Sequence, residues 1–416
     1  MDETQSQTKP LPVTKQMVRL AYKKVKTKGK AYGVDEMSMT DFEEKLNRNL
    51  YKIWNRLASG TYFPPAVREV EIPKKDGKMR KLGIPTIGDR IAQTVVKDYM
   101  ETSIDKLFHE NSYGYRPLKS AHQALEQAKI NVKKFDWVID MDIKGFFDNI
   151  SHELILKALD KVVPEKWVKM YCKRWLEMPV QKIDGTIVGK EGRGTPQGGV
   201  ISPLLANLFL HYAFDMWITK KRPLIRFERY ADDIIVHCHT QRVAKEILLQ
   251  ITERMNQCQL ELHPLKTKIV YCKDFKRKEQ YEQVQFDFLG FSFQPRPTKD
   301  YRTGKIQNQF DLAISRASQK KIIEEINNYR IHRRSISTIE DIAAALNTRL
   351  LGWINYYGHF RKWAFLNMFR RLSYRLMQWV QNKYKLIGIS QSYQWLRNYQ
   401  REHPNLFAHW RVGFKQ

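Results

Sequence analysis

Apolar residues recur at helical spacing along the first part of the chain. In residues 13–25 and 42–58 they return every three or four positions, with Lys, Arg and Glu between them. Gly33-Val34-Asp35 interrupts this pattern, because glycine and aspartate favour turns. The first 62 residues are therefore predicted to form helices.

The periodicity changes at residue 67 from helical spacing to alternation. The segment VREVEIPKKDGKMRKLGIP has two alternating stretches separated by Lys75-Asp76-Gly77, which is typical of a β-hairpin with a tight turn. Residues 91–108 and 120–132 return to helical spacing. Residues 136–142 alternate again and place Val138, Asp140 and Asp142 on one face of a strand.

The middle of the chain mixes helices and short strands. A turn at Asp184-Gly185 indicates another hairpin. The segment LIRFERYADDIIVHCH has apolar flanks around an acidic centre, which indicates strand, tight turn and strand. The remaining patterns predict helices over 152–176, 202–218 and 241–260, and a strand pair over 284–293.

Beyond about residue 305 the pattern is helical, over 315–330, 337–351 and 362–386. From Ile342 to the end there are 12 Lys and Arg against one acid, interleaved with Trp and Tyr. Most of these rings are expected to be buried in the helical core. The predicted fold class is α+β, in four parts: 1–62, 63–300, 305–386 and a basic, aromatic segment 387–416.

The net charge of the chain indicates what kind of partner it binds. The chain of 416 residues carries 72 Lys and Arg against 44 Asp and Glu, a net charge of +28. Nucleic acid explains this excess best, because phosphates and released counterions favour binding. No run of about 18 apolar residues and no secretory leader is visible, and the four cysteines form no C-x-x-C pair. A cytoplasmic location, with no membrane partner, is expected.

Candidate chemistry centres on Tyr230-Ala231-Asp232-Asp233, at the tip of a predicted hairpin. A pair of acids in a turn is by itself more often a solvated turn than a site. Asp142, however, ends a second predicted strand, and Phe147 follows five residues later. Acids from two neighbouring strands can bridge two Mg²⁺ ions about 4 Å apart, as nucleotidyl transfer requires.

Several further motifs occur in a recognisable order, and together they resemble a group II intron-encoded reverse transcriptase, or a free-standing bacterial relative, over nearly the whole chain. The motifs are IPKKDGKMRKLGIPTIGDRIAQ (72–93), SYGYRP (112–117), DIKGFFDNISH (142–152), GTPQGGVISPLLANLFL (194–210), RYADD (229–233), FLGF (288–291) and LLGWINYYGHF (350–360).

The resemblance implies a right-hand polymerase with fingers, palm and helical thumb, which adds dNTPs to a primer 3′-hydroxyl on an RNA template. It implies two Mg²⁺ ions, with Mn²⁺ able to substitute, held by Asp142, Asp232, Asp233 and the Ile143 carbonyl. Asp140, on the strand face of Asp142, is either an acid behind the metal ligands or a structural residue. A DNA primer or RNA–DNA hybrid, and the protein's own intron RNA, are the implied partners.

The nucleotide site is also implied residue by residue. Phe147 matches an aromatic that would clash with a 2′-hydroxyl and so select dNTPs; a plain core Phe is the alternative. Lys74 and Arg80 match triphosphate-binding residues, with the register uncertain by one residue because other lysines surround them. Gln197 matches a residue packed against the nucleotide and template, although a plain loop would also use glycines. Lys266 matches a lysine near the leaving pyrophosphate, although a lone lysine is more often a surface charge.

Contacts to template and primer are implied at six positions: Arg116, Pro196, Gly198, Tyr230, Leu289 and Gly290. The basic face of the C-terminal helices is expected to hold an RNA–DNA duplex through its shape and backbone. Nothing in the sequence specifies an oligomeric state.

The chain departs from many intron-encoded relatives at its end, where only about 30 residues without cysteine follow Lys385. An H-N-H endonuclease is therefore not expected. Three alternatives to a mobile-element reverse transcriptase with splicing (maturase) activity stay open: a host-adopted enzyme in defence or repair, an RNA-binding splicing factor without catalysis, and a viral-type RNA polymerase. The three acids disfavour the second alternative, and Phe147 disfavours the third.

Overall fold

The computed structural model describes residues 10–28, 31–73, 79–299, 304–366, 368–385 and 388–414. The chain divides into two compact units, each built from several stretches of sequence. Unit 1 contains Met1–Ser120, Met141–Val236 and Lys245–Thr267. Unit 2 contains Ala121–Asp140, His237–Ala244 and Lys268–Gln416.

Three helices open unit 1: α1 (Lys15–Lys26), α2 (Met39–Glu44) and α3 (Leu46–Ala58). The hydroxyls of Thr14 and Ser38 cap the first two helices by accepting backbone N–H bonds. The single helix predicted over 42–58 is wrong, because Lys45 leaves helical geometry at φ −118° and ψ 37°. α1 packs against α4 (Ile87–Asp105) through a face that includes Val18 and Val25.

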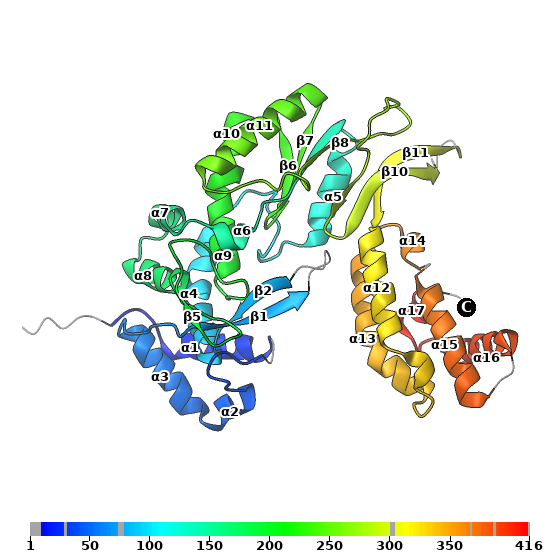
Figure 1. The fold of residues 1–416 in the computed structure, drawn as a ribbon, viewed down its shortest axis with the longest axis horizontal. Coiled ribbons are helices and arrows are strands. Elements are labelled where there is room, and N and C mark those ends of the chain that lie inside the picture. The colour runs from blue at the N-terminus through cyan, green and yellow to red at the C-terminus, as the bar shows by residue number, and fades with distance from the viewer. Residues whose placement is uncertain are drawn as a thin grey trace, which may run out of the picture. The chain divides into compact units, whose positions relative to one another are not determined.

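The alternating segment after residue 67 forms the predicted hairpin, in which β1 (Val67–Pro73) pairs with β2 (Met79–Ile84). Residues 74–78 at its tip, including Lys74, lie outside the described residues. β4 (Val180–Gln181) runs parallel to β1, and β5 (Ile187–Val188) pairs antiparallel with β4. The resulting sheet has the order β2-β1-β4-β5, and Figure 1 labels β1, β2 and β5 in it.

The predicted helix over 152–176 is wrong in one respect, because it is two helices, α7 (His152–Val162) and α8 (Lys166–Leu176). Pro164 separates them, and Val163 before it is extended at φ −119° and ψ 105°. A proline disfavours helical geometry at the preceding residue, which explains this break.

A four-stranded sheet carries the acidic motifs, with the strand order β6-β7-β3-β8. Its strands are β3 (Trp137–Met141), β6 (Arg226–Tyr230), β7 (Asp233–Cys238) and β8 (Lys268–Tyr271). The apolar segment that starts at Ser202 is a helix, as predicted, but a π-helical turn interrupts it. The other helices of residues 121–257 are α5 (Ala121–Asn131), α6 (Phe146–Asn149), α9 (Ser202–Leu210), the π-turn η1 (His211–Asp215), α10 (Met216–Lys221) and α11 (Gln241–Gln257).

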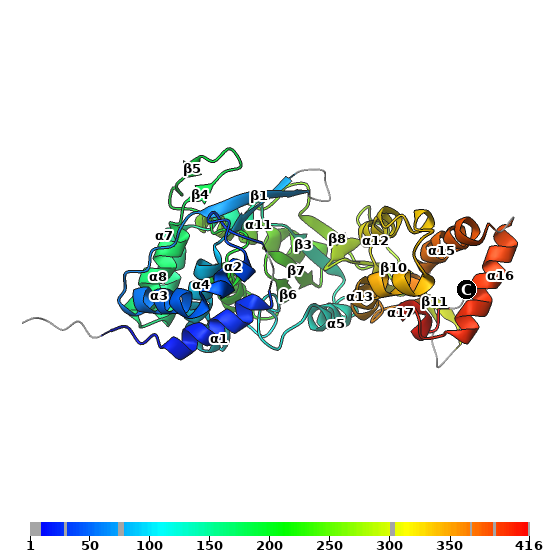
Figure 2. The ribbon, with the colours of Figure 1, turned by 90° about the horizontal axis from the view of Figure 1, so that it is seen from below.

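Unit 2 ends in a helical bundle preceded by three strands, which Figure 2 shows from below. The strands are β9 (Phe286–Phe288), β10 (Phe291–Lys299) and β11 (Ile306–Ile314), in the order β11-β10-β9. β11 was not predicted, because its inner half is uniformly buried and lacks alternation. The helices are α12 (Arg316–Asn328), η2 (Ile331–Arg333), α13 (Ile339–Tyr357), α14 (Lys362–Leu366), α15 (Phe369–Tyr384), α16 (Ile389–Glu402) and α17 (Ala408–Arg411).

The C-terminal aromatic rings are only partly buried. Trp379 lies in the core of the bundle, and Tyr357 packs at its edge. Trp363, by contrast, is 78% exposed and is an exception to the predicted burial of most of these rings. All four cysteines are buried free thiols. None of the described helices combines the length and the apolar character that a bilayer crossing requires.

Candidate active site

The hairpin of β6 and β7 presents the two adjacent acids of unit 1 at its turn. β6 ends at Tyr230 and β7 begins at Asp233, so Ala231 and Asp232 form the turn. Ala231 has a φ of +58°, an uncommon conformation for a residue with a side chain. Asp232 is half-buried and Asp233 is exposed. The turn therefore holds the carboxylates on a backbone that other contacts must keep in place.

Asp142 follows the end of β3. Its carbonyl accepts the N–H of His263 at 2.7 Å, and its carboxylate Oδ2 lies 3.2 Å from the ammonium Nζ of Lys266. The pKa of Asp232 is raised, mainly by burial and further by the negative charge of Asp142. Arg80 and Arg229 oppose this rise. Acids 90 residues apart in sequence therefore act on one another electrostatically in the folded chain.

The donor chemistry of these acids suits a hard divalent cation. Two half-buried like charges cost free energy that a cation between them would remove. Among the described residues no three His, Cys, Asp or Glu side chains already form a metal-binding cluster, and Lys266 pairs with Asp142 instead. Ile143 forms an isolated bridge with Leu262 through the hydrogen bonds of its neighbours, so this bridge does not use its carbonyl.

A cavity of about 240 Å³ in unit 1 brings three of the motifs together. β2 contributes Arg80, the segment after Phe147 contributes Asp148, and the Pro-Gln-Gly-Gly loop contributes Gln197. The amide nitrogen of Gln197 donates to both carboxylate oxygens of Asp148 at 3.2 Å. Arg80 also acts on the pKa of Asp232, so this cavity adjoins the acidic turn.

The Pro-Gln-Gly-Gly loop is anchored to the neighbouring hairpin at close range. The N–H of Gly83 donates to the carbonyl of Gln197 at 2.8 Å. Gly198 has a φ of +119°, and a Cβ there would lie 2.6 Å from the Gly83 carbonyl oxygen. Only glycine permits this approach. Pro196 lines the same cavity, so the loop's role here is to close one wall of it.

Phe147 is half-buried, unlike the fully buried Phe146 beside it. Its carbonyl accepts the N–H of Thr195 at 2.7 Å, which ties it to the Pro-Gln-Gly-Gly loop. Lys190 also lines the cavity, and the sequence offered no signal for it. Burial lowers the pKa of Lys190 to about 8, partly offset by Asp148.

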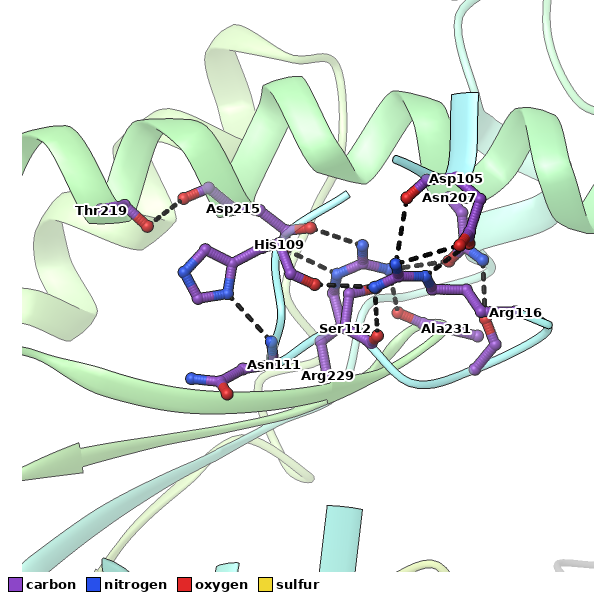
Figure 3. A network of polar contacts seen from close by, with 11 residues as sticks. Asp105, His109, Asn111, Ser112, Arg116, Asn207, Asp215, Thr219, Arg229 and Ala231 are labelled. Carbon is purple, nitrogen blue, oxygen red and sulfur yellow. Dashed lines mark hydrogen bonds and ion pairs between the residues drawn. The ribbon is translucent and has the colours of Figure 1, made fainter. Parts of the chain in front are cut away.

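Arg116 turns inward and is not available to a template. Its guanidinium, with the side chain 7% exposed, pairs with Asp105 at 2.7 Å. It also donates to the carbonyls of Asp105, His109 and Ser112, as Figure 3 shows. We therefore assign Arg116 to the support of the SYGYRP loop and do not propose it as a template contact.

A second buried arginine was missed as a candidate, although it stands inside the RYADD motif. Arg229 is fully buried and pairs with the equally buried Asp215 at 2.6 Å (Figure 3). Its place inside the motif, directly before Tyr230 and the acidic turn, is the signal that could have identified it.

The SYGYRP loop meets the acidic turn at Gly114. A Cβ on Gly114 would lie 2.5 Å from the Ala231 nitrogen and 2.9 Å from the Tyr230 carbonyl carbon. Tyr115 follows at a φ of +54°, with its ring centroid 6.3 Å from that of Tyr230. Glycine at 114 is thus what allows the loop and the turn to pack.

We expect Gly114→Ala to lower polymerase activity about tenfold, because the added methyl must displace the turn that carries Asp232. Overpacking should also cost about 1–3 kcal/mol of unfolding free energy. Primer extension and thermal unfolding measure the two effects. Gly189→Ala is the matched control, since a Cβ there meets nothing within 4 Å. Equal activity of both variants would contradict the placement of the turn.

Unit 2 contains the remaining motif, the FLGF turn. Leu289 and Gly290 both have positive φ, +50° and +80°, and form the two-residue turn between β9 and β10. The Tyr356 hydroxyl donates to the Leu289 carbonyl at 2.8 Å, and the Ser318 hydroxyl donates to the Gly290 carbonyl at 3.0 Å. The helices α12 and α13, which carry Ser318 and Tyr356, therefore stabilise this turn.

Comparison with known proteins identifies the family of this chain. Residues 72–293, just over half of the chain, match the family described as reverse transcriptase (RNA-dependent DNA polymerase). Residues 319–399 match the group II intron maturase-specific domain. The chain belongs to the reverse transcriptase family and carries a maturase-specific domain.

Two sequence relatives, YkfC and LtrA, agree with this assignment. Protein YkfC of Escherichia coli is 30% identical over 58% of this chain and 73% of its own length. The group II intron-encoded protein LtrA of Lactococcus lactis is 27% identical over 82% of this chain and 68% of its own. A telomerase structure from Candida albicans aligns with 90% of this chain and 67% of its own, at a TM-score of 0.47 and 11% identity.

The family assignment confirms the predicted α+β reverse-transcriptase fold and the predicted RNA-directed DNA polymerase class. Reverse transcriptases use divalent metal ions and bind an RNA template. The roles of the individual site residues in this chain stay predictions.

Proposed function

We propose that this protein copies RNA into DNA with two Mg²⁺ ions held by Asp142, Asp232 and Asp233, and that it binds group II intron RNA. The observation that carries the catalytic proposal is that Asp142 follows β3 and Asp233 begins β7, two neighbouring strands of one sheet. The negative charge of Asp142 also raises the pKa of Asp232. A purely structural protein gains nothing from two acids within electrostatic reach of one another, because their repulsion destabilises the fold.

The cavity beside the acids supports the proposed nucleotide-binding residues. Arg80 offers a guanidinium to phosphate oxygens, and Gln197 and Pro196 form a wall for the base and sugar. Phe147 stands next to the loop that carries this wall. Bound at the acids, Mg²⁺ would neutralise the triphosphate and increase the acidity of the primer hydroxyl. The chain itself contributes positioning and charge complementarity.

Lys74 and Lys266 are the remaining nucleotide candidates. The side chain of Lys266 is about half exposed, and its ammonium group pairs with the carboxylate of Asp142. We propose that its ammonium exchanges this carboxylate for a phosphate oxygen when a nucleotide enters. For Tyr230, Gly198, Leu289 and Gly290 we propose contacts to template and primer, since the first two flank the acids and the cavity, and the last two form a buttressed turn.

The direct test is templated extension of a DNA primer on an RNA template, with dNTPs and with rNTPs in parallel. We expect extension with dNTPs that requires a divalent ion, and little extension with rNTPs. Failure to extend with either set under Mg²⁺ or Mn²⁺ would overturn the catalytic proposal. Extension with rNTPs alone would identify an RNA polymerase instead.

The maturase-specific domain favours a second activity, the binding of an intron RNA that the protein helps to fold. Folded intron RNA beside the reading frame would support this role, together with faster splicing of that RNA when the protein is added. Reverse transcription without either result would favour a free-standing enzyme in defence or repair.

Binding of an RNA–DNA hybrid should weaken steeply with salt. The net charge of +28, and the 12 Lys and Arg against one acid after Ile342, supply the phosphate contacts. Engagement of about six phosphates predicts about a thousandfold loss of affinity between 50 and 200 mM salt. Titration of a labelled hybrid at several salt concentrations measures the slope.

A charge-removal variant shows whether the helical domain makes these contacts. Arg349 and Arg370 are exposed on α13 and α15. We expect Arg349→Gln with Arg370→Gln to reduce the logarithmic slope by about two, one for each lost phosphate contact. A slope equivalent to one or two phosphates in the wild type, or an unchanged slope in the variant, would contradict this role.

A further inference from the structure

We propose that the buried Arg229, through Asp215 and Asn207, positions the turn that presents Asp232 and Asp233. This inference rests on the proposed function of those acids. It assigns no contact with substrate to Arg229, which is 0% exposed. Arg229 is a positioning residue for the catalytic turn, three positions upstream of Asp232.

The guanidinium of Arg229 makes four hydrogen bonds, drawn in Figure 3. Two go to the carboxylate of Asp215, from Nε at 2.7 Å and from Nη2 at 2.6 Å. Nη1 donates to the Asn207 side-chain oxygen at 2.9 Å and to the Ala231 carbonyl at 3.2 Å. The last bond reaches the residue with positive φ in the turn itself. The planar guanidinium group of arginine can donate hydrogen bonds to all of these acceptors at once.

The π-helical turn η1 brings the two acceptors to one side of their helix. Asn207 and Asp215 are eight residues apart, so in a regular α-helix they would point roughly 80° away from each other. The wider π-turn over His211–Asp215 advances less per residue and removes much of this offset. Both side chains therefore reach the same guanidinium. π-turns of this kind are frequent at functional sites.

Asn207 extends the same network to the other side of the turn. Its amide nitrogen donates to the Gly114 carbonyl at 2.7 Å. Gly114 is the residue whose missing Cβ lets the SYGYRP loop pack against Ala231. The backbone of Arg229 also bonds to this loop, accepting from Tyr113 at 2.8 Å and donating to Asn111 at 2.9 Å. The turn is thus held from both sides by one buried group.

Stability alone gives no reason for a buried ion pair here. The desolvation of two charges offsets much of their attraction, and an apolar pair of similar volume is often equally stable. An apolar pair could not donate to the Ala231 carbonyl, however. A contribution to stability can therefore be distinguished from positioning of the turn in a variant in which apolar side chains replace both charges.

The test is Arg229→Met combined with Asp215→Leu, assayed in the full-length protein by primer extension on an RNA template. We expect kcat to fall about a hundredfold, because the carboxylates lose their fixed position. The KM for dNTP should change by less than about threefold, since the cavity around Arg80 is intact. Binding of the RNA–DNA hybrid should equal that of the wild type.

A matched control exists in unit 2. Arg277 and Asp274 form a similar ion pair, 11% and 15% exposed, and Arg277 also donates to two backbone carbonyls, those of Val132 and Phe135. Arg277→Met with Asp274→Leu should keep kcat within about threefold at temperatures below its unfolding midpoint. Equal losses of kcat in both double variants, or a wild-type kcat in the Arg229 double variant, would overturn the inference.

Arg229→Lys decides the question if the double variant does not fold. The lysine keeps the charge beside Asp215 but cannot reproduce the fork to Asn207 and Ala231. We expect a folded protein with kcat about tenfold lower, whereas kcat equal to the wild type would overturn the inference. The proposed function is tested separately: a wild-type protein that extends no primer refutes the function, and an active wild type beside fully active variants refutes only the positioning role.

Discussion

Asp142→Ala and Asp232→Ala should each abolish primer extension. Each variant removes a carboxylate from the pair whose charges act on one another, and with it a ligand of the proposed Mg²⁺ ions. Metal-assisted charge stabilisation contributes several kcal/mol, so the loss should be at least about a hundredfold. Extension of a DNA primer on an RNA template with dNTPs measures it.

RNA binding by the same variants should stay within about twofold of the wild type, because removal of a negative charge does not weaken binding to phosphates. Asp184→Ala is the matched control. Asp184 lies in the β4–β5 turn of the same unit and bonds locally, to the backbone and hydroxyl of Thr186. Residual extension above a few per cent in either active-site variant would contradict the assignment of these acids.

Phe147→Ala should admit ribonucleotides. The half-buried ring is tied to the Pro-Gln-Gly-Gly loop beside the cavity, where the sugar of an incoming nucleotide is proposed to lie. Its removal relieves a clash with the 2′-hydroxyl, and the preference for dNTPs over rNTPs should fall at least about tenfold. Ratios of kcat/KM for a matched dNTP and rNTP measure the discrimination.

The kcat/KM for dNTPs should fall by a smaller factor than the preference for dNTPs over rNTPs, because the three acids keep their positions. Phe63→Ala, at a ring that is 68% exposed in the same unit, is the control for loss of an aromatic side chain. A Phe147→Ala protein with wild-type discrimination would identify the ring as a core residue and remove the argument against an RNA polymerase.

Local chemistry explains what could be predicted from the sequence. The hairpins at residues 67–84 and 226–238 and the helices of the C-terminal domain have periodic patterns that depend only on neighbouring residues. The motif resemblance was also sufficient for the family, which the match over residues 72–293 confirms. Where the patterns failed, at Lys45, Pro164 and β11, the cause was a break in a helix or a strand with one uniformly buried half, which periodicity does not distinguish.

The tertiary structure decided which side chains are available to bind nucleic acid. Arg116 and Arg229 are both arginines in motifs of a nucleic-acid enzyme, and the sequence favoured Arg116 as a template contact. In the folded protein both guanidinium groups are buried and satisfied by carboxylates and carbonyls. The partners of Arg229, Asn207 and Asp215, share one side of their helix because of a π-turn that no local pattern announces.

By itself the sequence thus determined the class of chemistry, since its ordered motifs resemble those of the reverse transcriptase family, which the match over residues 72–293 confirms. Only the tertiary structure decided how the acidic turn is held and which charges face inward. The reason is that burial and hydrogen bonding depend on segments distant in sequence, whose approach is set by the packing of the whole fold.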